Sequence, residues 1–228
     1  MLLMRNRLVA VTVLLFVLCG AMLAADTSSL RPPKGARVAI IVFEDMQCPD
    51  CGRAEPLLKE ASQRYKIPLI RYDFPLPMHN WAFEAHVIAR YFDTKSPQLG
   101  EEFRHWVLMN QRSINKQNLR GMADRFAEEH KTPLPAFLDT NGELANKVRA
   151  DFQLGQKVGI DHTPTIYVVS NTQRGTPFVE VVDRSQLFQL VEEMLKNSEP
   201  VASEKPAAKP AAKKSGAKKP AAKKPAAQ

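Results

Sequence analysis

The chain has 228 residues, which is enough for one ordinary domain with a hydrophobic core and extensions at its ends. Its net charge of +8 belongs to those ends: residues 201–228 carry eight lysines and one glutamate, and residues 1–25 carry two arginines. Residues 26–200 have a net charge of −1, so the composition excludes a generally basic folded body.

Residues 1–25 have the pattern of an export signal. A short basic segment, MLLMRNR, precedes the apolar run LVAVTVLLFVL, and small residues near Ala25 offer a cleavage site. Leu23 is larger than the residue preferred at this distance before the cut, and the apolar stretch from Leu8 is at the lower limit for crossing a bilayer. The segment is therefore either a cleaved signal peptide or an uncleaved N-terminal anchor. Either one predicts a periplasmic or other extracytoplasmic location, where disulfides persist.

The sequence patterns between the export signal and the tail predict elements in the order β-α-β, a helical block, and then β-β-α. The polar, proline-rich residues 26–36 are typical of a linker, and the apolar run RVAIIVFED predicts a central buried strand. Helical spacing follows in PDCGRAEPLLKEASQRYK, where Pro56 predicts a kink, and IPLIRYDF predicts a second strand.

Three amphipathic helices are predicted between residues 81 and 130, and GELANKVRADFQLGQKVG predicts a fourth. The remaining elements are a strand in IDHTPTIYVVSN, a short strand in FVEVVD, and a last helix, RSQLFQLVEEMLKN, for which Ser185 is a candidate cap. Six aromatic residues of the helical block are expected in its core: Trp81, Phe83, Tyr91, Phe92, Phe103 and Trp106.

Residues 198–228 have the composition of a disordered tail. They repeat lysine, proline and alanine, lack large apolar side chains to bury, and combine mutually repelling charges with helix-breaking prolines. The tail is either a solvated spacer or a polycation that holds the protein near an anionic cell-envelope polymer or lipid. The export signal argues against nucleic acid as a partner.

Cys48 and Cys51 form a CxxC motif that three kinds of site could use. A structural zinc site needs about four Cys or His ligands in close pairs, and the five histidines offer no such pair, which disfavours a metal. A purely structural disulfide here closes too short a loop to stabilise the fold much. A redox-active pair that exchanges disulfides with other proteins is the third alternative.

The redox interpretation accounts for more of the surrounding sequence. A strand, a CxxC and a helix in succession place Cys48 at a helix N-terminus, where free N–H groups and the helix dipole favour a thiolate. Cys51, one turn further on, is close enough to attack a mixed disulfide and release the partner. Pro164, preceded by Thr163 and followed by a strand, is suited to lie beside the dithiol and let substrate backbone pair there.

The motifs FEDMQCPDC, FPLPMH and GIDHTPTIYVV resemble the DsbA-like branch of the thioredoxin superfamily, over residues 37–197. The resemblance implies an α/β thioredoxin-like fold, with a four- or five-stranded sheet and a helical insertion at about residues 78–145. It implies periplasmic thiol–disulfide exchange, with Cys48 as nucleophile, Cys51 as resolving cysteine and Pro164 as a cis-proline. No cofactor is expected, because the disulfide itself is the reactive group.

One departure from the family pattern concerns proton transfer. Many thioredoxin-fold enzymes carry a buried carboxylate six residues before the first cysteine, where this chain has Val42. Glu44 and Asp45 are nearby, but they are expected to point elsewhere or to lie past the end of the strand. The sequence therefore leaves the proton acceptor of the dithiol unidentified.

A second departure is the pair of residues between the cysteines, Pro49 and Asp50. An acidic side chain next to a thiolate opposes it, so Asp50 is expected to make the disulfide a weaker oxidant. Replacing Asp50 with histidine is expected to lower the pKa of Cys48 and to make the potential less negative by some tens of millivolts, since about 30 mV corresponds to about 1.4 kcal/mol.

Two histidines are weaker candidates for the site. His162 precedes Thr163 and, if it is cationic near the sulfurs, would favour a thiolate; otherwise it is an exposed loop residue. His79, at the end of a strand, either shares the active-site edge or has no part in it.

The expected function is that of an exported dithiol oxidase, acting on unfolded or cysteine-containing exported proteins and reoxidised by a membrane redox partner. Two alternatives stay open. One is a disulfide reductase or isomerase fed by a membrane donor. The other is a non-enzymatic protein that binds polyanions through its basic tail and uses the CxxC structurally.

Overall fold

The computed structural model describes residues 25–172 and 175–200. The export signal and most of the basic tail lie outside these residues. Within the described ranges, none of the helices combines the length and the apolar composition needed to cross a bilayer.

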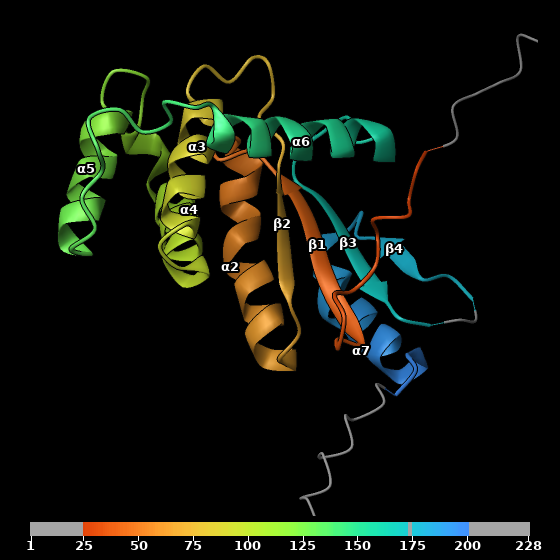
Figure 1. Cartoon of the computed structure of the whole chain (residues 1–228). Coiled ribbons are helices and arrows are strands. Elements are labelled where there is room, and N and C mark those ends of the chain that lie inside the picture. The colour runs from red at the N-terminus through yellow and green to blue at the C-terminus, as the bar shows by residue number, and fades with distance from the viewer. Residues whose placement is uncertain (1–24, 173–174, 201–228) are drawn as a thin grey trace, which may run out of the picture.

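Four strands form one mixed sheet in the order β2-β1-β3-β4 (Figure 1). They are β1 Val38–Glu44, β2 Leu69–Asp73, β3 Thr165–Ser170 and β4 Phe178–Glu180. β1 is parallel to β2 and antiparallel to β3, and β3 is antiparallel to β4. In this register Glu44 lies beside Asp73, so the ends of β1 and β2 bring two acidic residues next to each other.

Helices cover both faces of the sheet, and this explains why β1 is apolar on both sides. α2 Pro49–Tyr65 and α7 Leu187–Asn197, the latter preceded by the 3-10 turn η2 Arg184–Gln186, pack on the face that carries Val42. α6 Glu143–Val158 packs on the face that carries Ile41 and Phe43. Every residue of β1 is buried as a result, as expected for a central strand.

The helical insertion expected from the sequence lies between β2 and α6. It consists of α3 Ala82–Asp93, α4 Pro97–Asn110 and α5 Leu119–Glu129, with the 3-10 turn η1 Gln111–Ser113 after α4. These helices stand to one side of the sheet, on the left in Figure 1, and share an apolar core of their own. Met46, two residues before Cys48, is fully buried in that core. The loop that carries the cysteines is therefore attached to the insertion as well as to the sheet.

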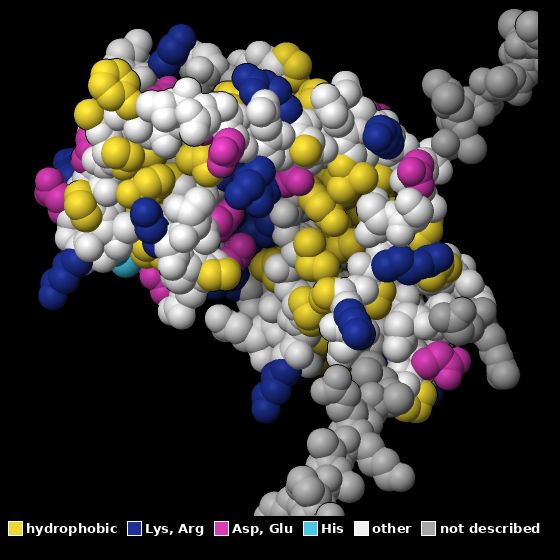
Figure 2. All heavy atoms as spheres, in the orientation of Figure 1, with side chains coloured by type: hydrophobic (Ala, Val, Ile, Leu, Met, Phe, Trp, Pro, Cys, Tyr) yellow, Lys and Arg dark blue, Asp and Glu magenta, His cyan; other side chains and the backbone are white. Residues whose placement is uncertain are grey.

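Charged side chains join the insertion to the sheet. Figure 2 shows acidic and basic side chains intermingled in the seam between the α3–α5 block and the strands. Arg90 of α3 pairs with Asp73 of β2 and with Asp151 of α6. Within the insertion, Arg104 of α4 donates two hydrogen bonds to Asp93 of α3. The seam holds elements that are far apart in the sequence.

Some local expectations need correction. Residues 26–36 do not run as a free linker, because Leu30 is fully buried against the sheet and the Asp26 N–H donates to the Lys157 carbonyl at 2.8 Å. Phe83 is 37% exposed and so lies outside the core. The residue that caps the turn before α7 is Asp183, whose carboxylate accepts from the Ser185 N–H; Ser185 itself is not the cap. α2 continues through Pro56 as one helix, and a kink there stays a prediction.

Candidate active site

The CxxC motif lies where β1 gives way to α2. Cys48 is the N-cap of α2, in an extended backbone conformation, and Pro49 occupies the first turn, where no backbone donor is needed. Both cysteines are free thiols in this structure. Cys48 is 8% exposed and Cys51 is 2% exposed, so Cys48 is the more accessible of the two, as the sequence predicted.

The loop before β3 comes back to the dithiol from a point more than a hundred residues away. The Thr163–Pro164 peptide bond is cis, which confirms the sequence-based prediction. The Cys48 thiol donates a hydrogen bond to the Thr163 carbonyl at 3.3 Å. Cys48, Cys51, Thr163 and Pro164 therefore form one cluster.

The environment favours the thiolate form of Cys48 and lowers the pKa of its thiol to about 5. The largest contribution to this lowering is a hydrogen bond from the Cys51 side chain, whereas burial of Cys48 raises the pKa. The Thr163 side chain and hydrogen bonds from the N–H groups of Cys51 and Asp50 lower it further. The Thr163 hydroxyl is buried and has no hydrogen-bond partner among the described residues. It is therefore available to the thiolate.

Cys51 has the opposite character. The pKa of the Cys51 thiol is raised well above its ordinary value. Burial is the largest cause, followed by the hydrogen bond with Cys48, the charge of Cys48 and the charge of Glu44. The Asp45 N–H donates to Cys51 Sγ at 3.4 Å and works in the other direction. One sulfur is thus a ready nucleophile, and the other stays protonated until its proton has an acceptor.

Arginines change the expectation for Asp50. Arg184 reaches from η2 to donate to the Asp50 carboxylate at 2.7 Å and to its backbone carbonyl at 3.2 Å, and Arg53 donates to the same carboxylate at 3.1 Å. Burial opposes ionisation of Asp50, but the hydrogen bond and charge of Arg184 and the charge of Arg53 outweigh it and lower its pKa. The negative charge beside Cys48 is therefore offset, and the Asp50 N–H favours the thiolate.

Buried polar side chains hold the loop between β1 and Cys48 in place. The fully buried carboxylate of Asp45 accepts from the N–H groups of Gln47 at 2.7 Å and Leu76 at 2.6 Å, and it lies 2.8 Å from the His79 ring. His79 thus does share this edge of the site, through Asp45. Asp45 lies one residue past the end of β1, as expected, and its oxygens satisfy backbone donors of two loops.

Two further side chains fix the same loop from the insertion. The Met46 N–H donates to His86 Nε2 at 3.3 Å, and the other ring nitrogen lies 2.8 Å from Asp73. The Gln111 amide donates to the carbonyls of Met46 at 2.8 Å and Cys48 at 2.9 Å. These contacts make the position of Cys48 depend on α3 and η1.

Glu44 was expected to point elsewhere or to lie past the end of the strand, but it is the last residue of β1 and its charge acts on Cys51. It is buried and faces the same side of the sheet as Val42, because side chains alternate along a strand. One of its oxygens accepts from Arg71 at 2.7 Å, and the other, Oε1, has no hydrogen-bond partner within the described residues. Burial raises the pKa of Glu44 to about 7, the charge of Arg71 opposes this, and the charges of Glu55 and Glu101 add to it.

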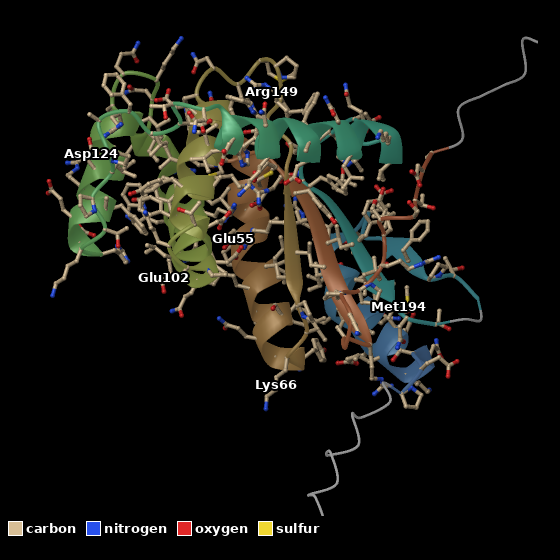
Figure 3. The ribbon with its side chains drawn as sticks, in the orientation of Figure 1. Glu55, Lys66, Glu102, Asp124, Arg149 and Met194 are labelled. Carbon is tan, nitrogen blue, oxygen red and sulfur yellow. The ribbon has the colours of Figure 1, made fainter. Side chains whose placement is uncertain are left out.

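The cluster around Glu44 extends from the dithiol to the surface. The buried Arg71 guanidinium also donates to Glu55 at 2.8 Å and to Glu101 at 2.9 Å. Glu55 follows Cys51 by one helical turn on α2 and projects toward α4 (Figure 3), where His105 lies 2.9 Å from its carboxylate. A single cation is thus shared by three carboxylates.

His162 is placed away from the sulfurs. Its imidazole is 62% exposed and pairs with Asp161 at 2.7 Å, and no contact with Cys48 is formed. A metal site was another alternative raised by the sequence. The described residues contain no group of three His, Cys, Asp or Glu side chains arranged to hold a metal ion.

Sequence reasoning missed several residues of the site: Glu55, Arg71, His86, Gln111 and Arg184. One signal was available for Arg71, since a charged residue inside an apolar strand is buried only if it is paired. Another was the spacing of Cys51 and Glu55, which puts both on one helix face. No local pattern points to Gln111 or Arg184, because their partners lie far away in the sequence.

Comparison with known proteins gives a consistent picture of the fold. The family model described as Thioredoxin matches residues 33–176. The crystal structure of alpha-DsbA1 from Wolbachia pipientis has a TM-score of 0.58 and 18% identity, covering 73% of this chain and 89% of that one. A periplasmic thioredoxin-like protein from Salmonella enterica serovar Typhimurium has a TM-score of 0.57 and 21% identity, covering 72% of this chain and 87% of that one.

Similarity to curated sequences is confined to part of a larger protein. A Na(+)/H(+) antiporter NhaA 3 from Salinispora tropica is 24% identical over 161 residues, which is 69% of this chain and 24% of the antiporter. The chain therefore spans about a quarter of the length of the curated relatives it matches.

Proposed function

The chain belongs to the thioredoxin family, and from this premise we propose that it is an exported thiol–disulfide oxidoreductase. Its substrates are cysteine pairs in unfolded or cysteine-containing exported proteins, which it oxidises through Cys48 and Cys51. Pro164 and Thr163 position the substrate backbone, and a membrane redox partner reoxidises the dithiol. A periplasmic location is supported by the export signal and by the description of the Salmonella neighbour as periplasmic.

The observation that carries the proposal is the difference between the two thiols. The pKa of Cys48 is lowered to about 5 while that of Cys51 is raised, although the two residues are one helical turn apart. A stabilised Cys48 thiolate stabilises the reduced form of the protein, and a stable reduced form makes the disulfide a stronger oxidant. This favours oxidation of substrates over their reduction.

The exchange proceeds in two substitutions at sulfur. A substrate thiolate attacks Cys48 Sγ of the Cys48–Cys51 disulfide, that bond breaks, and its electron pair leaves on Cys51, which takes up a proton. The second substrate thiolate attacks the substrate sulfur of the mixed disulfide and expels the Cys48 thiolate. The substrate has then lost two electrons and two protons; the protein holds both electrons and one proton, and the other proton goes to solvent.

Glu44 is our candidate for the group that exchanges a proton with Cys51. It is buried, its charge acts on the Cys51 thiol, and its free oxygen Oε1 is not committed to another residue of the described structure. Its pKa of about 7 suits a group that must both give and accept a proton near neutral pH. Glu44 would thus supply, two residues further along β1 and on the same face, the carboxylate absent at Val42.

The equilibrium of the Cys48–Cys51 pair with glutathione tests the direction of the reaction. Potentials run from about −120 mV for DsbA to about −270 mV for thioredoxin. We expect a value nearer the first. A value near the second would favour the alternative, a reductase or isomerase fed by a membrane donor, and absence of any exchange would overturn the proposal.

The role of the basic tail is a separate proposal. Eight lysines in residues 201–228 would hold the enzyme near an anionic cell-envelope polymer or lipid. Removing these residues should leave activity on a small disulfide unchanged and weaken binding to anionic vesicles, most clearly below about 0.15 M salt. Equal vesicle binding with and without the tail would eliminate this role, together with the alternative of a non-enzymatic polyanion-binding protein.

A further inference from the structure

A groove of about 470 Å³ opens beside the reactive cysteine. One wall contains Gln47 and Pro49, the two neighbours of Cys48 in the chain. The other wall is built by the end of α4 and by η1. None of the residues around the cis-proline lines this groove, so it is distinct from the place where substrate backbone would meet Pro164.

The floor of the groove is apolar. It is lined by Trp81, Leu108 and Ile114, which are each less than 7% exposed and are therefore held in place by packing. Met109 lies on the wall and is 44% exposed, which is unusual for a large apolar side chain of this protein. Methionine is flexible and polarizable, and it adapts to apolar side chains of different shape.

The rim of the groove is positively charged. Arg53 and Arg112 line it, and the lining contains no aspartate or glutamate. Arg112 forms no ion pair within the part of the chain that the structure describes, and Arg53 pairs with Asp50, which Arg184 already neutralises. Asp50 is thus paired with both Arg53 and Arg184, and the groove lining itself carries two arginines and no carboxylate, so its charge is positive.

Contacts between neighbouring elements hold the walls of the groove in place. Gln111 ties η1 to the cysteine loop through the carbonyls of Met46 and Cys48. α2 packs closely on the same wall, since a Cβ at Gly52 would lie only 2.9 Å from the Leu108 carbonyl oxygen. Preformed walls lower the entropic cost of binding an extended segment.

We propose that this groove binds a polypeptide segment that combines an apolar side chain with acidic side chains next to the reacting cysteine of the substrate. The inference rests on the proposed function for the reaction at Cys48, and it adds the class of sequence that the enzyme prefers. The basic tail of the chain is unsuited to the groove, because its lysines would meet the arginines of the rim.

Two matched peptides test the preference. Each contains one cysteine next to leucine, flanked by two glutamates in one peptide and by two lysines in the other. The rate of thiol attack on the oxidised full-length protein is divided by the rate of the same peptide with bis(2-hydroxyethyl) disulfide, which removes differences in intrinsic thiol reactivity. We expect the acidic peptide to react about tenfold faster at low salt, with the ratio approaching 1 at high salt.

Binding of the same peptides with serine in place of cysteine, followed by fluorescence anisotropy, gives a second readout that needs no exchange chemistry. The double variant Arg53→Gln/Arg112→Gln should lose most of the preference in both assays. A control that removes the same charge elsewhere, Lys59→Gln/Lys196→Gln, should retain it. If the wild type discriminates in binding but performs no exchange, the groove stands and the proposed function falls.

Three outcomes would overturn the inference. The first is an exchange-active protein with equal rates and equal affinities for the two peptides. The second is a preference that survives the double arginine variant and disappears when residues 201–228 are removed, which would assign it to the tail. The third is a dimer in sedimentation that dissociates in Arg112→Gln, which would place a second copy in the groove.

Discussion

Glu44 and Asp73 end neighbouring strands, lie side by side in the sheet and are both fully buried, yet their protonation differs. The pKa of Asp73 is lowered, because His86, Arg104 and Arg90 together outweigh the effect of burial. The pKa of Glu44 is raised to about 7, because burial prevails over the one nearby arginine. Asp73 has a partner for each oxygen, whereas Glu44 Oε1 has none in the described structure.

The difference shows that burial alone does not decide the charge of a carboxylate. The charge depends on how many cations and hydrogen-bond donors each carboxylate has that it does not share with another carboxylate. The cluster around Asp73 joins α3, α4 and α6 to β2, and it is suited to holding these elements together. The cluster around Glu44 divides one guanidinium among three carboxylates, and it is suited to exchanging a proton next to Cys51.

Arg71→Met breaks the cluster around Glu44 and should have the largest effect on stability. It leaves Glu44 and Glu55 buried without their cation, and removing one partner of a buried ion pair costs about 3–5 kcal/mol. The loss of unfolding free energy should be larger at pH 8 than at pH 5, since carboxyl groups left without a cation are less costly to bury when they are protonated. Urea unfolding at both pH values measures it. A loss below about 1 kcal/mol, or no rescue by adding Glu44→Gln, would contradict this account.

Glu44→Gln should change how stability depends on pH. In the wild type the folded-state pKa of Glu44 is about 7 and the ordinary value is 4.5, so its contribution is fully present below pH 4.5 and is lost as the pH rises through 7. Relative to the wild type, the variant should therefore become more stable between pH 5 and pH 8, by up to about 3 kcal/mol. A constant difference between the two unfolding free energies would show that Glu44 does not titrate in this range.

Asp73→Asn tests the other member of the pair. It removes the negative charge that Arg90 and His86 share, at a cost of about 2 kcal/mol in unfolding free energy at pH 7. Because the folded-state pKa is lowered, the stabilisation is present above the ordinary value of 3.8 and is lost as the pH falls through the folded-state pKa. Titration of Asp73 itself should therefore add no change between pH 5 and pH 8, unlike titration of Glu44. Any change over this range in the Asp73→Asn difference would come from Asp151, whose pKa is raised to about 6 by burial and by the charge of Asp73.

Asp50 adds a half-exposed carboxylate to the comparison and should give the smallest effect. Removing its charge in Asp50→Asn should make the potential less negative by at most about 20 mV, since exposed ion pairs contribute up to about 1 kcal/mol. Arg184→Gln should shift the potential in the opposite direction, and the double variant should return close to the wild-type value. Glutathione equilibria of the four proteins decide this, and a shift of Asp50→Asn beyond about 60 mV would mean that Arg184 does not offset its charge.

Much of the fold follows from local sequence patterns. The apolar run before the cysteines predicted β1, the helical spacing after them predicted α2, and a proline before an apolar run predicted the start of β3. The position of Cys48 at a helix N-terminus was predicted in the same way. These features depend on residues that are neighbours in the chain, so a short window contains the information.

Other features could not be predicted because they depend on a distant partner. Leu30 looked like a linker residue until the face of the sheet was in place to bury it. The position of Asp45 past the end of β1 was expected, but its burial was not, because its oxygens satisfy N–H groups of loops that only the fold brings together. Phe83, expected in the core, is 37% exposed, because it lies on a different side of α3 from Ala85, Ala89 and Phe92, which pack in the core of the insertion.

The sequence by itself therefore determined the order of the elements, the position of the dithiol at the start of α2, and Pro164 as the residue beside the dithiol. These features could be predicted because helix and strand propensity, side-chain periodicity and backbone chemistry act within a few residues. The tertiary structure decided the charge states around that dithiol. Arg184 offsets Asp50 from 134 positions away, and Arg71 divides its charge between glutamates of β1, α2 and α4. Electrostatic energy depends on distance in space and on burial, and neither is defined until the chain has folded.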